Sequence, residues 1–519
     1  MPNLIDFART APDRPALIYG NGESVETYAQ LEQRSRQVAH MLRGFGLVEG
    51  DGVAVLVGNE DEFFDLYWGA QRVGLYFTAV NWHLAEAEVR YIVENCDAKV
   101  LFASARMEKL AVAGGKATNL EQRISLHGEI EGFTRYEDAV GAAPEDPPLD
   151  HQRGGSVMLY SSGTTGQPKG VRRPLPGRDF DDPILGLAAA GFGGMFGFRE
   201  GDRYICPAPL YHAAPLAFSA NQHFLGSTVV VMRRFDPEQA LQIIQNQKVT
   251  ISQWVPTHFK RMLELPPERR KRYDVSSLRV AVHAAAPCPV PVKRAMIDWW
   301  GPILWEYYAG TEGGGTIIDS EQWLAHPGSV GRPWPGAQVM LFDERGQPID
   351  EPRREGAIYF AAAAEPLARF EYHKDEEKTR SSYRGDWFTL GDVGFLDEEG
   401  YLFLTDRQSN MIISGGVNIY PQETENCLMA HERVHDVAVI GVPSDSMGEE
   451  VKAVVIPATG ARPGPELESE LIEYSRTQIA HYKCPRSIDF ADELPRTETG
   501  KLQKRKIKQR YWEGRDSLI

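Results

Sequence analysis

One segment, residues 160–171, constrains this chain more than any other. It reads Tyr-Ser-Ser-Gly-Thr-Thr-Gly-Gln-Pro-Lys-Gly-Val and follows a short apolar run at residues 157–159, which predicts a strand leading into a tight loop. Glycines let the backbone approach a ligand closely, and backbone N–H groups and hydroxyls can donate hydrogen bonds to anionic oxygens. Lys169 adds a point charge suited to phosphate. This segment, called the phosphate loop below, therefore predicts a polyphosphate site.

The phosphate loop differs from the common nucleotide-binding loop. That pattern has Gly, four residues, Gly-Lys and then Ser or Thr, whose hydroxyl binds magnesium. Here Pro168 precedes Lys169 and Gly170 follows it, so the hydroxyl is missing from that place. A flexible surface loop rich in Gly, Ser and Thr is the alternative when the segment is taken alone. The motifs further along the chain favour the ligand-binding interpretation.

Charge and composition argue against a nucleic-acid-binding, zinc-binding, secreted or membrane-spanning protein. Of the 519 residues, 42% are hydrophobic and 25% are charged, and the net charge is −16. These values indicate a globular protein of more than one domain and disfavour nucleic-acid binding. Five scattered cysteines without CxxC spacing predict reduced thiols, no zinc site and a cytoplasmic location. We expect no secretion signal and no transmembrane segment, because the most apolar stretch, residues 184–198, is too short and better suits a packed interior helix.

Helical and strand patterns alternate through the first 330 residues. Residues 28–46 have apolar side chains at helical spacing, whereas 53–57 and 98–103 are typical of buried strands. Such alternation predicts an α/β fold with layered, largely parallel sheets. Short strands and turns after about residue 330 indicate a small β subdomain. We therefore expect a large N-terminal domain over 1–406 and a smaller, mobile α+β C-terminal domain over 407–519.

A second motif lies at residues 306–315. Tyr308 precedes Thr311, Glu312 and three consecutive glycines. The aromatic ring can stack on a base, the threonine can donate to a phosphate and the carboxylate can hold magnesium. A glycine-rich turn is the alternative for this segment alone.

Three further motifs follow towards the C-terminus. Asp392 stands in Gly-Asp-Val, where a carboxylate can accept two hydrogen bonds from ribose hydroxyls. Residues 405–421 contain Thr-Asp-Arg and then Ser-Gly-Gly, and Lys501 follows a glycine in residues 495–505. A turn aspartate and a solvated charged helix are the alternatives for the first and last of these motifs.

Together, in this order, the five motifs resemble those of the acyl-adenylate-forming superfamily, which includes acyl-CoA synthetases, luciferases and nonribosomal-peptide adenylation domains. The resemblance spans essentially the whole chain. It implies an ATP- and Mg²⁺-dependent acyl-CoA synthetase that activates a carboxylic acid as acyl-AMP, releases pyrophosphate and transfers the acyl group to CoA. It also implies that the C-terminal domain rotates between these two half-reactions.

The resemblance also implies a role for each motif residue. The ATP phosphates would be bound by the phosphate-loop residues Ser161, Ser162, Gly163, Thr164, Thr165 and Lys169. Adenosine would be held by Tyr308, Ala285, Asp392 and Arg407. Glu312 would ligate magnesium, Thr311 would contact phosphate, and Lys501 would span the carboxylate and the α-phosphate. The pantetheine arm of CoA would pass near Ser414, Gly415 and Gly416.

His212 stands in Pro-Leu-Tyr-His-Ala-Ala-Pro, where the family places an aromatic or histidine gate beside the substrate carboxylate. A structural histidine is the alternative. Amino-acid-activating relatives carry an aspartate in this region and this chain has none, so an amino-acid substrate is disfavoured. The chain also departs from the family's usual hinge residues at Ser409 and Asn410 and carries Ala284 where many relatives have glycine.

The substrate acid stays open among fatty, aryl and steroid-like acids. One enzymatic alternative is an adenylating enzyme that loads a carrier-protein thiol or, as luciferases do, passes the acyl group to oxygen. A non-catalytic acyl- or nucleotide-binding relative is the alternative from another class. The oligomeric state, including a homodimer, also stays open.

Overall fold

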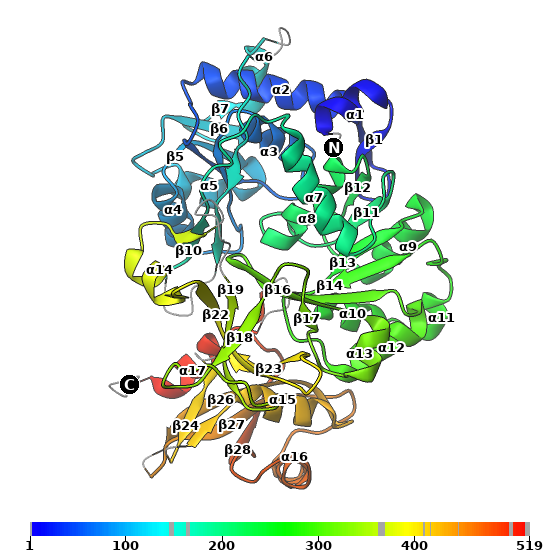
Figure 1. Ribbon diagram of the computed structural model, residues 1–519, viewed down its shortest axis with the longest axis vertical. Coiled ribbons are helices and arrows are strands. Elements are labelled where there is room, and N and C mark those ends of the chain that lie inside the picture. The colour runs from blue at the N-terminus through cyan, green and yellow to red at the C-terminus, as the bar shows by residue number, and fades with distance from the viewer. Residues whose placement is uncertain are drawn as a thin grey trace.

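Two parts stacked along the long axis make up the protein in the computed structural model, a broad N-terminal part and a smaller C-terminal part (Figure 1). The structure describes residues 3–144, 150–161, 167–361, 369–407, 410–415, 417–444, 446–497 and 502–513. Within those ranges, no helix is both long and apolar enough to cross a membrane.

A six-stranded sheet forms the first layer of the N-terminal part, and every neighbouring pair in it is parallel. Its spatial order is β7 (Thr134–Arg135), β6 (Gln122–Leu126), β5 (Ala98–Ser104), β3 (Gly52–Leu56), β4 (Tyr76–Ala79) and β8 (Ser156–Val157). The helices of this region are α2 (Tyr28–Gly44), α3 (Phe63–Gln71), α4 (Glu86–Asn95), η1 (Ala105–Met107), α5 (Glu108–Gly114) and α6 (Tyr136–Gly141). All of β3 is buried because helices cover both faces, which explains its unbroken apolar sequence.

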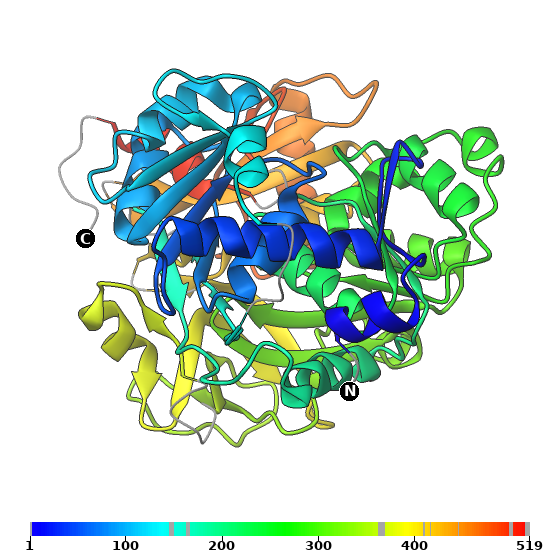
Figure 2. The same ribbon diagram turned by 90° about the horizontal axis from the view of Figure 1, so that it is seen from above.

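A nine-stranded sheet forms the second layer, parallel in its centre and antiparallel at both edges. Its order is β17 (Arg332–Pro333), β16 (Gly313–Asp319), β15 (Leu304–Gly310), β14 (Val280–His283), β13 (Ile251–Trp254), β11 (Arg203–Cys206), β12 (Thr228–Val231), β1 (Pro15–Tyr19) and β2 (Ser24–Thr27). Its helices are α1 (Leu4–Thr10), α7 (Pro183–Met195), α8 (Ala213–Phe224), α9 (Pro237–Gln247), α10 (Pro256–Leu263), α11 (Pro267–Arg270), α12 (Val290–Trp300) and α13 (Ser320–Ala325). Seen from above, the long helix α2 (dark blue) extends across the top of both layers (Figure 2).

Two smaller sheets complete the N-terminal part. A three-stranded sheet has the order β20 (Glu371–Tyr372), β10 (Lys169–Arg172) and β9 (Leu159–Ser161). The β subdomain contains β18 (Val339–Phe342), β19 (Gly356–Ala361), β22 (Trp387–Leu396), β21 (Tyr383–Arg384) and β23 (Leu402–Arg407), together with α14 (Glu376–Ser382). Its strands pair in the antiparallel sense throughout, as expected for short strands joined by turns.

The C-terminal part is a mixed sheet with helices. Its elements are β24 (Ile412–Ser414), β25 (Val417–Ile419), α15 (Pro421–Met429), β26 (Val434–Ser444), β27 (Gly448–Pro457), α16 (Pro465–Gln478), β28 (Ser487–Phe490) and α17 (Lys504–Trp512). It meets the N-terminal part through polar contacts. Lys260 Nζ donates to the His435 carbonyl at 2.7 Å, and Asn418 Nδ2 donates to Glu344 Oε1 at 3.0 Å.

The α/β fold class predicted from the sequence is confirmed, with a large N-terminal domain, a small β subdomain and a C-terminal domain. The boundary at residues 406/407 stays a prediction. One expectation is wrong in part. Helix α7 does pack against α8, with the rings of Phe192 and Phe218 5.0 Å apart, but Leu187 is 60% exposed, so the helix is only partly interior. A helix that is apolar all round carries no sequence signal for which face is covered.

Candidate active site

The phosphate loop joins two antiparallel strands, β9 and β10. Ser161 ends β9 and pairs with Lys169, the first residue of β10, so the strand predicted before the loop is present. The Lys169 ammonium lies 5.8 Å from the centre of the Tyr372 ring and 3.8 Å from Asp375 Oδ2. Four residues predicted to bind phosphate lie outside the described residues, namely Ser162, Gly163, Thr164 and Thr165.

Three adenosine residues, each predicted from a different motif, meet in the structure. Tyr308 on β15 donates its hydroxyl hydrogen to Oδ2 of Asp392 on β22 at 2.5 Å, and the Asp392 side chain is buried. Asp392 also pairs in register with Arg407 at the end of β23. A side-chain hydrogen bond and a strand pairing therefore bring together three residues that were predicted to bind the nucleotide.

Thr311 and Glu312 form the tight turn between β15 and β16. Gly310 and Gly313 close the turn as a register pair. A Cβ at Gly310 would lie 2.8 Å from Glu312 Oε2, so a side chain there would displace the carboxylate. The turn therefore presents Glu312 at the end of a strand, where polar ligand-binding residues of α/β sheets are found.

Two residues that the sequence reasoning missed hold this turn. Tyr372 donates its hydroxyl hydrogen to Glu312 Oε1 at 2.7 Å, and Arg173 Nη2 donates to the Glu312 carbonyl at 2.7 Å and to the Thr311 carbonyl at 3.5 Å. Burial, and then the nearby charge of Glu312, raise the pKa of the Tyr372 hydroxyl, whereas burial lowers the pKa of the Arg173 guanidinium. The available signal was a pair of arginines, Arg172 and Arg173, at the end of β10 in an acidic chain; β10 is called the phosphate strand below.

Ala285 and His212 follow strands of the same sheet. Ala285 comes two residues after β14 and has φ +76°, which is uncommon for a residue with a side chain and is found preferentially at functional sites. His212 comes immediately before α8, and its ring lies 4.3 Å from that of Tyr211. Because β11, β14 and β15 run parallel, residues that follow them lie along the same edge of the sheet as Glu312.

The C-terminal candidates are only partly described. Ser414 and Gly415 lie at the turn between β24 and β25, and Gly415 N donates to the Met447 carbonyl at 2.8 Å. Gly416 and Lys501 lie outside the described residues, as does Ser409 of the hinge. The role of Lys501 therefore stays a prediction.

The residues present fit a magnesium ion that arrives with its nucleotide. Within the described ranges, no group of three or more His, Cys, Asp or Glu side chains could hold a metal ion by itself. Mg²⁺ is commonly held by one or two carboxylates together with substrate phosphates. Glu312 offers one carboxylate at the turn, and the phosphate strand is joined to it through Tyr372.

Comparison with known proteins places this arrangement in a family. The model of the AMP-binding enzyme family matches residues 4–364, and the model of the AMP-binding enzyme C-terminal domain matches residues 423–501. The chain belongs to the AMP-binding enzyme family. The resemblance drawn from the sequence motifs is thereby confirmed.

Members of this family are similar to the chain over nearly its whole length. A fatty acid–[acyl-carrier-protein] ligase, ScoC, of Streptomyces coeruleorubidus is 30% identical, covering 97% of this chain and 95% of the relative. A feruloyl-CoA synthase of an Amycolatopsis species is 32% identical, covering 97% of each chain. The crystal structure of the anthranilate CoA ligase AuaEII with anthranoyl-AMP has a TM-score of 0.84 and 27% identity, covering 98% of this chain and 97% of that one.

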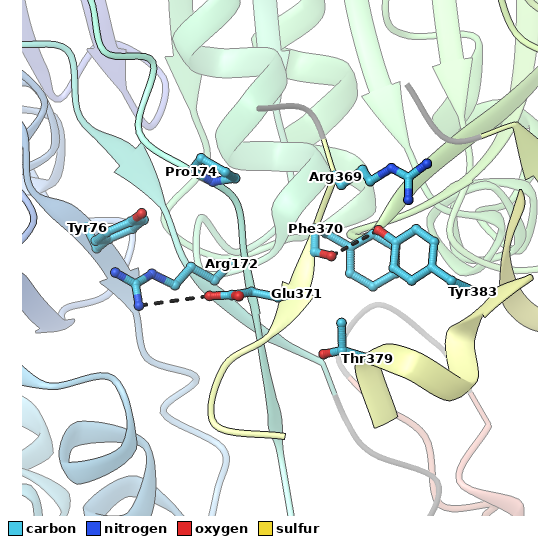
Figure 3. Close-up of a pocket in the computed structure, with 8 residues that line it drawn as sticks. All are labelled: Tyr76, Arg172, Pro174, Arg369, Phe370, Glu371, Thr379 and Tyr383. Carbon is cyan, nitrogen blue, oxygen red and sulfur yellow. Dashed lines mark hydrogen bonds and ion pairs between the residues drawn. The ribbon is translucent and has the colours of Figure 1, made fainter. Parts of the chain in front are cut away.

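An open cleft of about 620 Å³ lies beside the phosphate strand of this AMP-binding enzyme (Figure 3). It is lined by Tyr76, Arg172, Pro174, Arg369, Phe370, Glu371, Thr379 and Tyr383. Side chains alternate along a strand, so Arg172 points away from the face that carries Lys169. Among the described residues, none that was predicted for the active site lines this cleft.

Proposed function

We propose that the protein is an ATP-dependent acyl-CoA synthetase that converts a carboxylic acid to acyl-AMP and then to an acyl-CoA thioester. The chemistry of its family, acyl-adenylate formation followed by thioester transfer, is that of an AMP-forming acid–thiol ligase. The observation that carries the proposal is the joining of the phosphate strand to Glu312 through the Tyr372 hydroxyl. That contact supports the proposal because it links the strand that follows the predicted phosphate loop to a carboxylate that would suit magnesium.

The first half-reaction joins two anions. A carboxylate oxygen of the acid attacks the α-phosphorus of ATP, the bond to the bridging oxygen of pyrophosphate breaks, and pyrophosphate leaves with that electron pair. Lys169 and the phosphate loop would hold the β- and γ-phosphates, and Glu312 would hold Mg²⁺, which supplies charge neutralisation when bound. Lys501 would stabilise the charge that develops on the α-phosphate oxygens, while the Tyr308–Asp392 pair would orient the adenosine.

The second half-reaction moves the acyl group to sulfur. The CoA thiolate attacks the acyl carbonyl carbon, the bond to the AMP oxygen breaks, and AMP leaves. The turn at Ser414 and Gly415 would lie along the path of the pantetheine arm. Lys501 and the thiol would use the same space in turn, so rotation of the C-terminal domain between steps would serve both.

The names of the relatives support a fatty or aromatic acid. They differ in the thiol acceptor, which is an acyl carrier protein for some relatives and CoA for others. ScoC is named for a fatty acid and an acyl carrier protein, whereas the feruloyl and anthranilate enzymes are named for aromatic acids and CoA. CoA is the acceptor we propose, and loading of a carrier protein is the alternative that ScoC favours. The five free cysteines and the need for ATP and CoA favour a cytoplasmic location.

A panel of fatty, aryl and steroid-like acids tests the proposal. Purified protein with ATP, Mg²⁺ and each acid should exchange labelled pyrophosphate into ATP when no thiol is present. Added CoA should then give AMP and an acyl-CoA of the expected mass, with holo acyl carrier protein as the parallel acceptor. Nucleotide binding without AMP release for any acid would instead support the non-catalytic alternative.

A further inference from the structure

Arg173 is the second of two arginines after the phosphate loop, and its position ties two layers of the site together. It directly follows β10, and its carbonyl accepts a hydrogen bond from the Tyr76 hydroxyl on β4 at 3.0 Å. From this fixed backbone its guanidinium reaches the turn at Thr311 and Glu312, 138 and 139 residues away in the chain. Arg173 thus connects the strand that carries the phosphate loop to the main chain of the candidate magnesium ligand.

The turn has room for this guanidinium because of a glycine. Gly313 has φ +118°, which residues with side chains rarely adopt, and a Cβ there would lie 3.1 Å from Arg173 Nη2. Gly313 therefore permits both the backbone conformation of the turn and the close approach of the arginine.

Two independent contacts then fix Glu312. Arg173 holds its carbonyl and Tyr372 holds Oε1 of its carboxylate, at 2.7 Å in each case. Tyr372 pairs in register with Val171 on β10, so one contact comes from the three-stranded sheet and the other from the residue directly after its strand β10. Arg173 Nε is buried without a hydrogen-bond partner among the residues that the structure describes, so the guanidinium is held only through its Nη2 donor there.

We infer that Arg173 is a positioning residue that sets Glu312 against β10, the strand that begins at Lys169, so that magnesium and the nucleotide phosphates are bound together. The inference rests on the proposed function and adds to it a residue that acts through Glu312 without touching the substrate. Residues that orient a metal ligand commonly change metal affinity by about 10- to 100-fold when they are lost.

The test measures nucleotide binding without turnover. Isothermal titration with α,β-methylene-ATP, an analogue that cannot release pyrophosphate, is carried out in Mg²⁺ and again in EDTA. Arg173→Gln should weaken binding in Mg²⁺ by about tenfold or more and leave binding in EDTA within about twofold. Arg173→Lys should fall between wild type and Arg173→Gln, because an ammonium keeps the charge but lacks the planar fork of donors.

Arg172→Gln is the matched control. It removes the adjacent arginine, whose side chain lines the cleft of Figure 3, and should leave Mg²⁺-dependent binding unchanged. A double-mutant cycle adds a second check, since Arg173→Gln should cause little further loss in a Glu312→Gln background.

Equal losses in Mg²⁺ and in EDTA would overturn the inference, because they would indicate direct phosphate binding or general damage to the loop. The inference would also be overturned if Arg173→Gln bound the ATP analogue in Mg²⁺ as tightly as the wild-type protein does. The proposed function fails separately. Suppose that the wild-type protein binds the analogue more tightly in Mg²⁺ than in EDTA, that Arg173→Gln abolishes this difference, and that the wild-type protein activates no acid. The positioning role then stands and the ligase assignment does not.

Discussion

Glu306 and Glu312 lie six residues apart along β15 and its turn, and their carboxylates differ in burial and in hydrogen-bond partner. Glu306 is buried, its Oε2 accepts a hydrogen bond from Lys293 Nζ at 2.5 Å, and His283 Nε2 lies 3.6 Å away. Glu312 is half-buried at the turn, and its carboxylate accepts from a tyrosine hydroxyl. A buried ammonium compensates the charge of the first carboxylate inside the protein. A neutral donor orients the second while leaving its charge available to a cation.

The same comparison applies to two lysines: Lys293 is a buried cation beside Glu306, whereas Lys501 is a cation that the C-terminal domain would bring to the site. Lys501→Ala should reduce acyl-AMP formation by about 1,000-fold, because the developing charge on the α-phosphate loses its stabilising ammonium. Pyrophosphate exchange measures this loss. Thioester formation from supplied acyl-AMP should stay within about threefold of wild type, and a loss of both half-reactions to the same extent would contradict the role given to Lys501.

Lys293→Met tests the structural carboxylate. Removing one partner of a buried ion pair leaves the other charge uncompensated, so unfolding should become easier by about 3 to 5 kcal/mol. Urea or thermal unfolding measures the change. The double variant Lys293→Met/Glu306→Gln should recover part of the loss, and Mg²⁺ dependence should not change in the folded protein. If Lys293→Met were as stable as the wild-type protein, Glu306 would not need a compensating charge, and the proposed difference between Glu306 and Glu312 would fail.

Glu312→Gln tests the ligand carboxylate. Adenylation should fall by about 100-fold and require more Mg²⁺, because an amide retains the shape of the side chain but not its charge. The melting temperature should stay close to wild type, since the Tyr372 hydroxyl can still donate to the amide oxygen. An unchanged magnesium dependence would show that Glu312 is not the ligand.

Glu26 provides a third, weaker test of how burial and compensation combine. Burial raises its pKa to about 7, opposed by the attraction of Arg34, and its neighbour Asp65 also has a raised pKa. Between about pH 4.5 and 7 the folded protein keeps a proton that the unfolded chain releases, so stability falls as pH rises through this window.

Comparing wild type with Glu26→Gln isolates this contribution. The wild type should lose about 1 to 2 kcal/mol relative to the variant between pH 5 and pH 7. Thermal unfolding at pH 5, 6 and 7 measures the difference. A gap between the two proteins that does not change with pH would contradict the raised pKa.

Parts of the fold could be predicted because their signals are local. Residues 53–57 and 98–103 are continuous apolar runs, and the structure places β3 and β5 there within one residue at each end. The positions of Arg173 and Tyr372 could not be predicted in this way. Their contacts with Glu312 span 139 and 60 residues, so no window of sequence contains both partners. The phosphate-loop pattern is defined by glycine, serine, threonine and lysine, so it does not point to an arginine or a tyrosine.

The sequence by itself determined the family, because the order and residue types of the motifs are those of its members, and from these motifs it predicted a phosphate loop, a nucleotide-binding aromatic and a magnesium carboxylate. Only the tertiary structure decided how each carboxylate is held. The motif singles out Glu312 but does not give the partner of either glutamate, and tertiary packing brings a buried lysine to Glu306 and a tyrosine hydroxyl to Glu312. The physical reason is that the environment of a charge depends on neighbours contributed by distant segments, which local sequence does not encode.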